Sequence, residues 1–162
     1  MLTHGFSHIG LTTHDMDATI AFYDGVLGFR RIADDLTQLA GSGTLRQVYF
    51  AVGPDQYIVF MEPKDVDGIP ADFDTSINGA LGLPRGMYHF AFKVATLDDL
   101  ELRRQDLDKQ GIDASPIIDL DTAKSVFCFD PNGVQLEFSC HVRAFNESDL
   151  ARVSEATLAQ PD

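Results

Sequence analysis

Two histidines and one glutamate have the residue types and positions that could bind a metal ion: His8, His89 and Glu137. Two imidazole nitrogens and a carboxylate oxygen form a facial ligand set, which leaves coordination positions of a divalent ion open. Such a set suits Fe(II), and Mn, Ni or Zn can take the same donors. An ion with open positions can polarise two neighbouring oxygen atoms of a substrate. The sequence therefore predicts one divalent metal as cofactor, with Fe(II) favoured, and a small chelating molecule as substrate.

The alternation of side chains along a strand places His89 and Glu137 away from the apolar face of their strands. Tyr88 and Phe90 flank His89 and lie on the face opposite to it. In the last strand-like segment, Glu137 shares its face with polar residues such as Ser139, while the apolar residues point the other way. Both candidate ligands are therefore expected on the face that a helix does not cover.

His8 and His89 occupy the same place in an internal repeat. His8 shares its strand face with Phe6 and Gly10, so the repeat is the stronger argument for this residue. Each histidine opens a segment with the order β, α, β, β, β. When such modules curve into half-barrels with the helix on the convex side, equivalent concave positions can converge on one point.

Periodicity and turn residues outline the elements that must position these side chains. Ile20, Tyr23 and Leu27 recur at helical spacing, and Gly28 ends that pattern. In the first module we predict strands over 6–13, 29–34, 46–52 and 57–61, with a helix between residues 15 and 28. In the second module we predict strands over 88–94, 112–118, 125–129 and 134–139, with a helix over 96–111.

These elements predict an α+β fold in which two βαβββ modules form a cupped, half-barrel mixed sheet. Residues 1–140 are expected to form one domain, with modules over 5–62 and 87–140 and a Gly-, Pro- and Asp-rich linker over 63–86. The remaining segment, 141–162, is a tail with a short helix expected within 146–160. Because each half-barrel exposes a strand edge, the modules are expected to pair within one chain or in a homodimer.

Composition narrows the classes of partner. The formal net charge of -13, from 25 acidic against 12 basic residues, disfavours nucleic acid and anionic membranes. No stretch approaches the ~20 apolar residues of a membrane span, and the first residues lack the pattern of a signal peptide. A cytoplasmic protein is therefore expected.

Two segments resemble the vicinal oxygen chelate superfamily, which includes glyoxalase I, extradiol ring-cleaving dioxygenases and fosfomycin-resistance proteins. Residues 17–29 read Asp-Ala-Thr-Ile-Ala-Phe-Tyr-Asp-Gly-Val-Leu-Gly-Phe, and residues 129–137 read Phe-Asp-Pro-Asn-Gly-Val-Gln-Leu-Glu. The resemblance covers about residues 5–140. It implies that His8, His89 and Glu137 take the family's metal-ligand positions.

Two departures from the family pattern bear on the reaction. Extradiol dioxygenases carry a catalytic histidine shortly before the final hairpin and a tyrosine within it. Residues 118–127 contain no histidine, and Phe127 stands at the tyrosine position. Glyoxalase I uses a further carboxylate from the last strand of the first module, where Phe60 is the aligned residue and Glu62 lies two residues farther along.

The leading hypothesis is a dioxygenase-like oxidoreductase that acts on a catechol-type substrate. One alternative is a lyase or isomerase of glyoxalase type, with Glu62 as fourth ligand or base, and another is a metal-dependent resistance or binding protein. Without the family histidine, proton transfer would fall to another group or to water. The candidates in this chain are Tyr49, Lys124 and Glu62.

Overall fold

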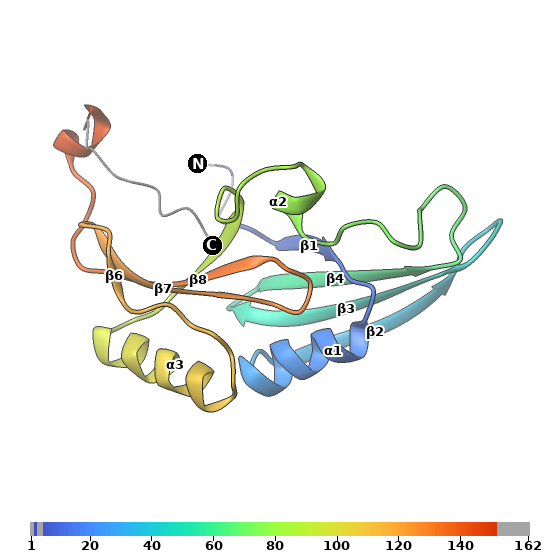
Figure 1. The fold of residues 1–162 in the computed structure, drawn as a ribbon, viewed down its shortest axis with the longest axis horizontal. Helices are drawn as coiled ribbons and strands as arrows, with labels where there is room; N and C mark the ends of the chain where they lie inside the picture. The colour runs from blue at the N-terminus through green and yellow to red at the C-terminus, as the bar shows by residue number, and fades with distance from the viewer. Residues whose placement is uncertain (1, 3–4, 152–162) are drawn as a thin grey trace. The chain divides into compact units, whose positions relative to one another are not determined.

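The computed structural model describes residue 2 and residues 5–151, which divide into two compact units (Figure 1). The first unit contains the chain up to Tyr88 together with Phe129–Val134. The second contains His89–Cys128 and the chain from Gln135 onward. The short turn 129–134 therefore belongs to a different unit from the strands that it connects.

The first unit is built on a four-stranded sheet with the order β1-β4-β3-β2. Strand β1 runs parallel to β4, and the other neighbouring strands are antiparallel. The bounds are β1 (His8–Thr12), β2 (Arg31–Gln38), β3 (Thr44–Gly53) and β4 (Gln56–Lys64). Each predicted strand of the first module has a counterpart here.

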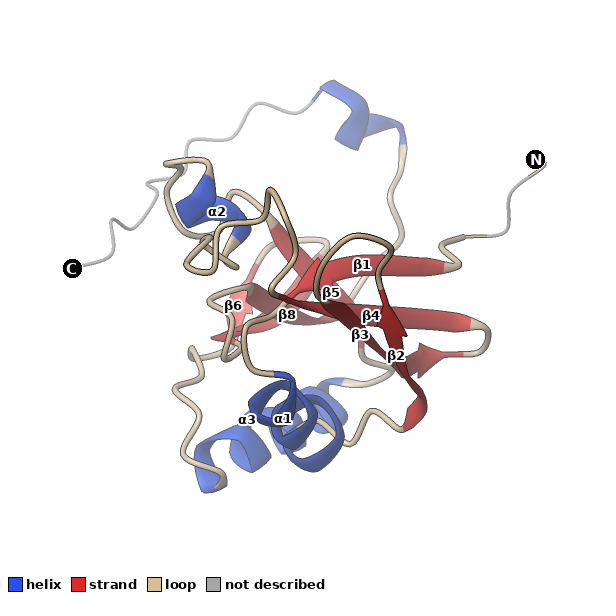
Figure 2. Cartoon of the chain, turned by 90° about the vertical axis from the view of Figure 1, so that its right-hand side faces the viewer, coloured by secondary structure: helices blue, strands red, loops and turns tan. Residues whose placement is uncertain are grey.

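One helical segment covers the apolar face of this sheet, on one side of the strands in Figure 2. It begins as α1 (Met16–Ile20), capped by Asp15, and continues as a π-helical stretch, η1 (Ala21–Val26). From η1, Tyr23 is fully buried against Phe50 of β3, with ring centroids 5.5 Å apart. The predicted helix is confirmed, but its second half is wider than an α-helix because Leu27 N–H bonds to the carbonyl five residues earlier.

The turn 129–134 enters the first unit through a buried polar network. The Asp130 carboxylate accepts hydrogen bonds from Tyr23 Oη at 3.0 Å and from the backbone N–H groups of Asn132 and Val134. The Asn132 amide also donates to Asp130 and to Thr19 of α1. These bonds fix the turn against the first helix.

The connection predicted as a linker contains a short helix, α2 (Ile77–Ala80). Within this segment the buried amide of Asn78 makes two hydrogen bonds of 2.8 Å to the backbone of Tyr88. Strand β4 also extends to Lys64, into the predicted linker. The connection is therefore ordered by its own polar contacts.

The second unit repeats the topology of the first, with the strand order β5-β8-β7-β6. Strands β5 and β8 are parallel, as β1 and β4 are. The bounds are β5 (His89–Lys93), α3 (Leu97–Lys109), β6 (Ile118–Asp119), β7 (Ala123–Phe129) and β8 (Gln135–His141). Thr96 caps α3, and Leu100 and Leu107 of this helix are buried. The predicted α+β fold with two βαβββ modules is confirmed.

One predicted strand is wrong over most of its length. Residues 112–117 form no regular strand, and β6 covers only Ile118 and Asp119. The Ser115 hydroxyl accepts the N–H of Phe127, and Pro116 has no N–H to offer a ladder. In the tail, the described part is a 3-10 helix, η2 (Glu147–Ala151), and the rest of the predicted terminal helix lies outside the described residues. No helix in the described part of the chain is both long and apolar enough to span a membrane.

Candidate metal centre

In the second unit, His89 and Glu137 come together on one face of the sheet. His89 opens β5, and in the parallel register with β8 it lies opposite Gln135, two residues before Glu137. His89 Nε2 lies 3.1 Å from Glu137 Oε2. The glutamate is only 6% exposed, whereas the histidine is exposed. An imidazole nitrogen at the surface thus meets a buried carboxylate oxygen.

The other oxygen of Glu137 is held by Ser125, which in turn contacts Ser139. Ser125 Oγ of β7 lies 2.6 Å from Glu137 Oε1 and donates to it. Ser139 Oγ of β8 lies 3.0 Å from Ser125 Oγ, and both serines are buried. Sequence analysis missed Ser125, because only the register of β7 against β8 reveals that it faces Glu137.

Phe127 lies on the same face of β7 as Ser125, because it is two positions farther along the strand. Its ring centroid is 6.2 Å from that of His89, in an edge-on arrangement. The side chain beside this histidine is therefore an apolar ring without a hydroxyl. A phenolic proton donor is missing where the resemblance places one.

In the first unit, His8 opens β1 just as His89 opens β5. It is exposed, and its register partner in β4 is Tyr57. The Ser7 hydroxyl lies 3.3 Å from His8 Nδ1, and the ring of Tyr49 is 6.4 Å away between centroids. His8 and His89 thus have the same topological position, each on the first residue of an edge strand parallel to its neighbour.

The donors present fit a divalent cation in chemistry, since an imidazole nitrogen and a carboxylate oxygen converge and a hydrogen bond holds the carboxylate. Among residue 2 and residues 5–151, no group of three or more His, Cys, Asp or Glu side chains gathers as a metal centre would require. The structure brings together His89 and Glu137. His8 belongs to the other unit, and the set of three ligands stays a prediction.

The structure does not place Glu62 on the face that bears His8. In β4, Glu62 shares its face with Phe60, which packs against Tyr23 on the helix side of the sheet. Register pairs His8 with Tyr57, on the opposite face. The Glu62 carboxylate is 4% exposed, accepts the N–H of Met16 at 3.2 Å and lies 3.4 Å from Lys64 Nζ. In this structure Glu62 is a buried acceptor at the start of α1, and its role as fourth ligand or base stays a prediction.

Lys124 lies on the face of β7 opposite to Ser125, and its role in proton transfer stays a prediction. It is adjacent to Ser125 in β7, so the two side chains point to opposite sides of the sheet. Lys124 Nζ pairs with Asp119 of β6 at 3.3 Å. Of the three proton-transfer candidates, Tyr49 alone shares a sheet face with a predicted ligand.

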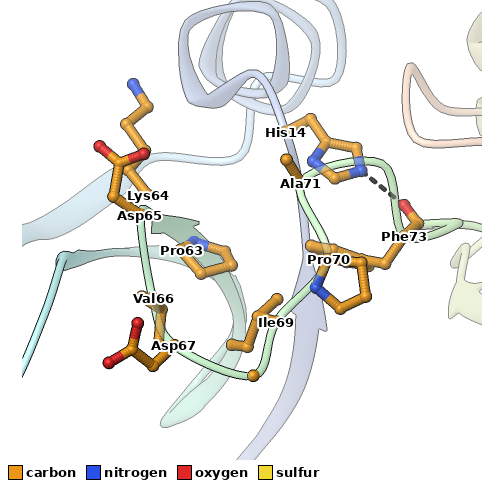
Figure 3. A pocket seen from close by; sticks show the side chains of 11 residues that line it. His14, Pro63, Lys64, Asp65, Val66, Asp67, Ile69, Pro70, Ala71 and Phe73 are labelled. Carbon is orange, nitrogen blue, oxygen red and sulfur yellow. Dashed lines mark hydrogen bonds between the residues drawn. The ribbon is translucent and has the colours of Figure 1, made fainter.

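A cavity of about 680 Å³ lies elsewhere in the first unit (Figure 3). It is lined by His14 and by residues from Pro63 to Phe73. His14 Nε2 is hydrogen-bonded to the carbonyl oxygen of Phe73, which closes one end of the loop around the cavity. None of the predicted metal ligands lines this cavity.

Comparison with known proteins agrees with the fold. A sequence profile of the Glyoxalase/Bleomycin resistance protein/Dioxygenase superfamily matches residues 5–138. Biphenyl-2,3-diol 1,2-dioxygenase of Metapseudomonas furukawaii is 26% identical over 146 residues, which are 89% of this chain and 43% of that enzyme. This chain therefore spans less than half the length of that relative.

Solved structures of several activities share the fold. Lactoylglutathione lyase from Agrobacterium tumefaciens matches with a TM-score of 0.58 and 20% identity, over 86% of this chain and 96% of that one. Fosfomycin resistance protein FosX from Mesorhizobium loti also matches with a TM-score of 0.58 and 20% identity, over 93% of this chain and 100% of that one. With the repeated βαβββ topology, the profile match shows that this chain belongs to the glyoxalase/bleomycin resistance/dioxygenase superfamily, the vicinal oxygen chelate proteins.

Proposed function

We propose that this chain is a divalent-metal-dependent enzyme of dioxygenase type that acts on a small catechol-type substrate. The observation that carries the proposal is the pairing of His89 with Glu137, whose Nε2 and Oε2 atoms lie 3.1 Å apart. The buried Ser125 hydroxyl donates to the other oxygen of this glutamate. The similarity to a biphenyl-2,3-diol dioxygenase supports a ring-cleaving activity, although it covers only 43% of that enzyme.

In this proposal, His89 and Glu137 hold the ion together with His8, which the repeat places at the position equivalent to His89. The ion, Fe(II) by preference, would supply Lewis-acid polarisation to two adjacent substrate oxygens. Phe127 offers an apolar ring beside His89, suited to pack against an aromatic substrate. Tyr49, near His8, is the residue best placed to move a proton at its phenolic oxygen.

The lyase alternative is weakened by the position of Glu62. A glyoxalase-type centre needs a further carboxylate from the first module, and Glu62 is bound to the backbone of Met16 on the helix side of the sheet. On the other hand, the absence of histidine from residues 118–127 removes the proton carrier that the family's ring-cleaving enzymes use. For this reason turnover of plain catechols is expected to be slow.

The test is a substrate panel with protein loaded anaerobically with Fe(II). Biphenyl-2,3-diol and simpler catechols are supplied with oxygen, and the hemithioacetal of methylglyoxal and glutathione is supplied separately. Oxygen uptake with a coloured ring-opened product supports the proposal. Thioester formation without oxygen uptake would establish the lyase alternative, and failure of the parent chain to bind any divalent ion would reject both.

A further inference from the structure

Glu137 has two carboxylate oxygens in different surroundings. Oε1 receives the hydroxyl hydrogen of Ser125 at 2.6 Å, and Oε2 lies 3.1 Å from the Nε2 atom of His89. A hydroxyl carries one hydrogen, so when Ser125 donates to Glu137, the 3.0 Å contact between the two serines requires Ser139 to donate to Ser125. The two serines therefore form a buried chain of hydroxyls that ends on Oε1.

We infer that Ser125, supported by Ser139, is a positioning residue that reserves Oε1 of Glu137 for the protein and leaves Oε2 to bind the metal. The inference rests on the proposed metal site. A hydrogen bond on one oxygen makes single-oxygen coordination more favourable than coordination through both, because the second mode would have to break that bond. A carboxylate without this bond can rotate about its terminal torsion, which has a broad energy profile.

The burial of both serines supports this role over that of a surface hydroxyl. Ser125 is 0% exposed and Ser139 is 7% exposed, so neither can exchange its partner for bulk water at low cost. Ser125 also stands on β7 while Glu137 stands on β8, so the bond crosses between neighbouring strands. The carboxylate is therefore tied to a second strand at one oxygen only.

The test compares Ser125→Ala with Ser125→Thr, Ser139→Ala and a control, Ser115→Ala. Ser115→Ala removes a hydroxyl that accepts the backbone N–H of Phe127, which lies in the same strand as Ser125. That hydroxyl does not contact Glu137. Affinity for Co(II) is measured by titration, and the visible Co(II) absorption reports coordination number, because added ligand atoms weaken these bands. In the metal-free protein, the ¹⁵N signal of the His89 ring reports the position of the carboxylate beside it.

We expect Ser125→Ala to weaken Co(II) binding by about 10- to 100-fold, to lower the intensity of the Co(II) bands and to move the His89 signal. Ser125→Thr should restore all three values, Ser139→Ala should give a smaller change, and Ser115→Ala should match the parent. Parent-like affinity, absorption and His89 signal in folded Ser125→Ala would overturn the inference. If the parent binds no metal, the proposed function fails, while an unmoved His89 signal still decides against Ser125.

Discussion

The two buried glutamates of the sheets show how strand parity determines the role of a carboxylate. Glu62 is 4% exposed and Glu137 is 6% exposed, so burial does not distinguish them. Glu62 faces the start of α1 and accepts a backbone N–H, whereas Glu137 faces an exposed imidazole. Of the two, Glu137 is the one with a carboxylate oxygen directed at a histidine nitrogen.

This difference predicts opposite results for two substitutions. His89→Ala should lose most of the bound metal, because one of the proposed ligands is removed. Glu62→Ala should keep the metal but lose about 1 to 3 kcal/mol of unfolding free energy, because the buried N–H of Met16 loses its acceptor. Elemental analysis and urea denaturation measure the two effects. Full metal content in single alanine variants of His8, His89 and Glu137 would refute the site.

The candidates for proton transfer can be separated in the same way. Tyr49 lies near His8, so Tyr49→Phe should lower kcat by about 100-fold or more if its hydroxyl moves a proton. Lys124→Ala should leave kcat close to the parent value, because Lys124 faces away from Ser125 and Glu137. Steady-state kinetics on the best substrate of the panel test both. A large loss in Lys124→Ala alone would assign the proton step to the lysine instead.

Buried hydrogen bonds from the Tyr23 hydroxyl and from two backbone N–H groups of the turn hold the Asp130 carboxylate in the turn 129–134. Burial raises the pKa of Asp130 above its ordinary value of 3.8, although Tyr23, Asn132 and Val134 donate to the carboxylate and oppose this change. The folded protein therefore binds the Asp130 proton more tightly than the unfolded chain does. The proton on Asp130 therefore adds to the free energy of unfolding at low pH. This stabilisation is lost as the pH rises through the raised pKa that Asp130 has in the folded protein.

Asp130→Asn should remove that dependence. As the pH falls from about 7 to about 4, the unfolding free energy of the parent should rise relative to that of the variant. Asp34→Asn is a control in which the pH dependence should have the opposite sign. Hydrogen bonding to Arg46 lowers the pKa of Asp34, so the stabilisation of the fold by the Asp34 carboxylate is lost as the pH falls. Urea denaturation at several pH values measures both. A parallel pH dependence in parent and Asp130→Asn would contradict the argument.

Local patterns predicted the elements well where the contacts are local. The alternation of His89 with Phe90 and the start of a helix near Thr96 need only neighbouring residues, and both are as expected. The failures depended on distant partners. Residues 112–117 do not extend because Ser115 bonds to Phe127. The bond between Met16 and Glu62 likewise joins residues far apart in the sequence, so no local pattern predicts it. Ser125 could not be recognised before the pairing of β7 with β8 was known.

In the described part of the chain, two sheets of equivalent strand order each end in strands that have one neighbour. In the first unit, edge strand β2 is largely exposed and carries Leu36 with 70% exposure. The unpaired backbone groups of a strand edge can pair with another strand. The pairing of modules, either within the chain or between two chains, stays a prediction.

We predict a homodimer in solution, with twice the chain mass of 17.8 kDa. Light scattering coupled to size exclusion measures this mass directly. Leu36→Lys should shift the equilibrium toward monomer if β2 contributes to the interface, because a charge would replace an apolar contact. An exclusively monomeric parent chain would remove the dimer and leave the metal site as a separate question.

Asp130 and Asn132 belong to the first unit, although they lie between two strands of the second unit in the sequence. The chain therefore cannot be cut between Tyr88 and His89 into two complete units. A fragment that ends at Tyr88 would lack the carboxylate that accepts the Tyr23 hydroxyl and the amide that donates to Thr19. A fragment that begins at His89 would carry this turn without its binding surface. Neither half should be an autonomous folding unit. Mixing the two fragments should instead restore structure by complementation, and the intact chain should unfold in one cooperative transition.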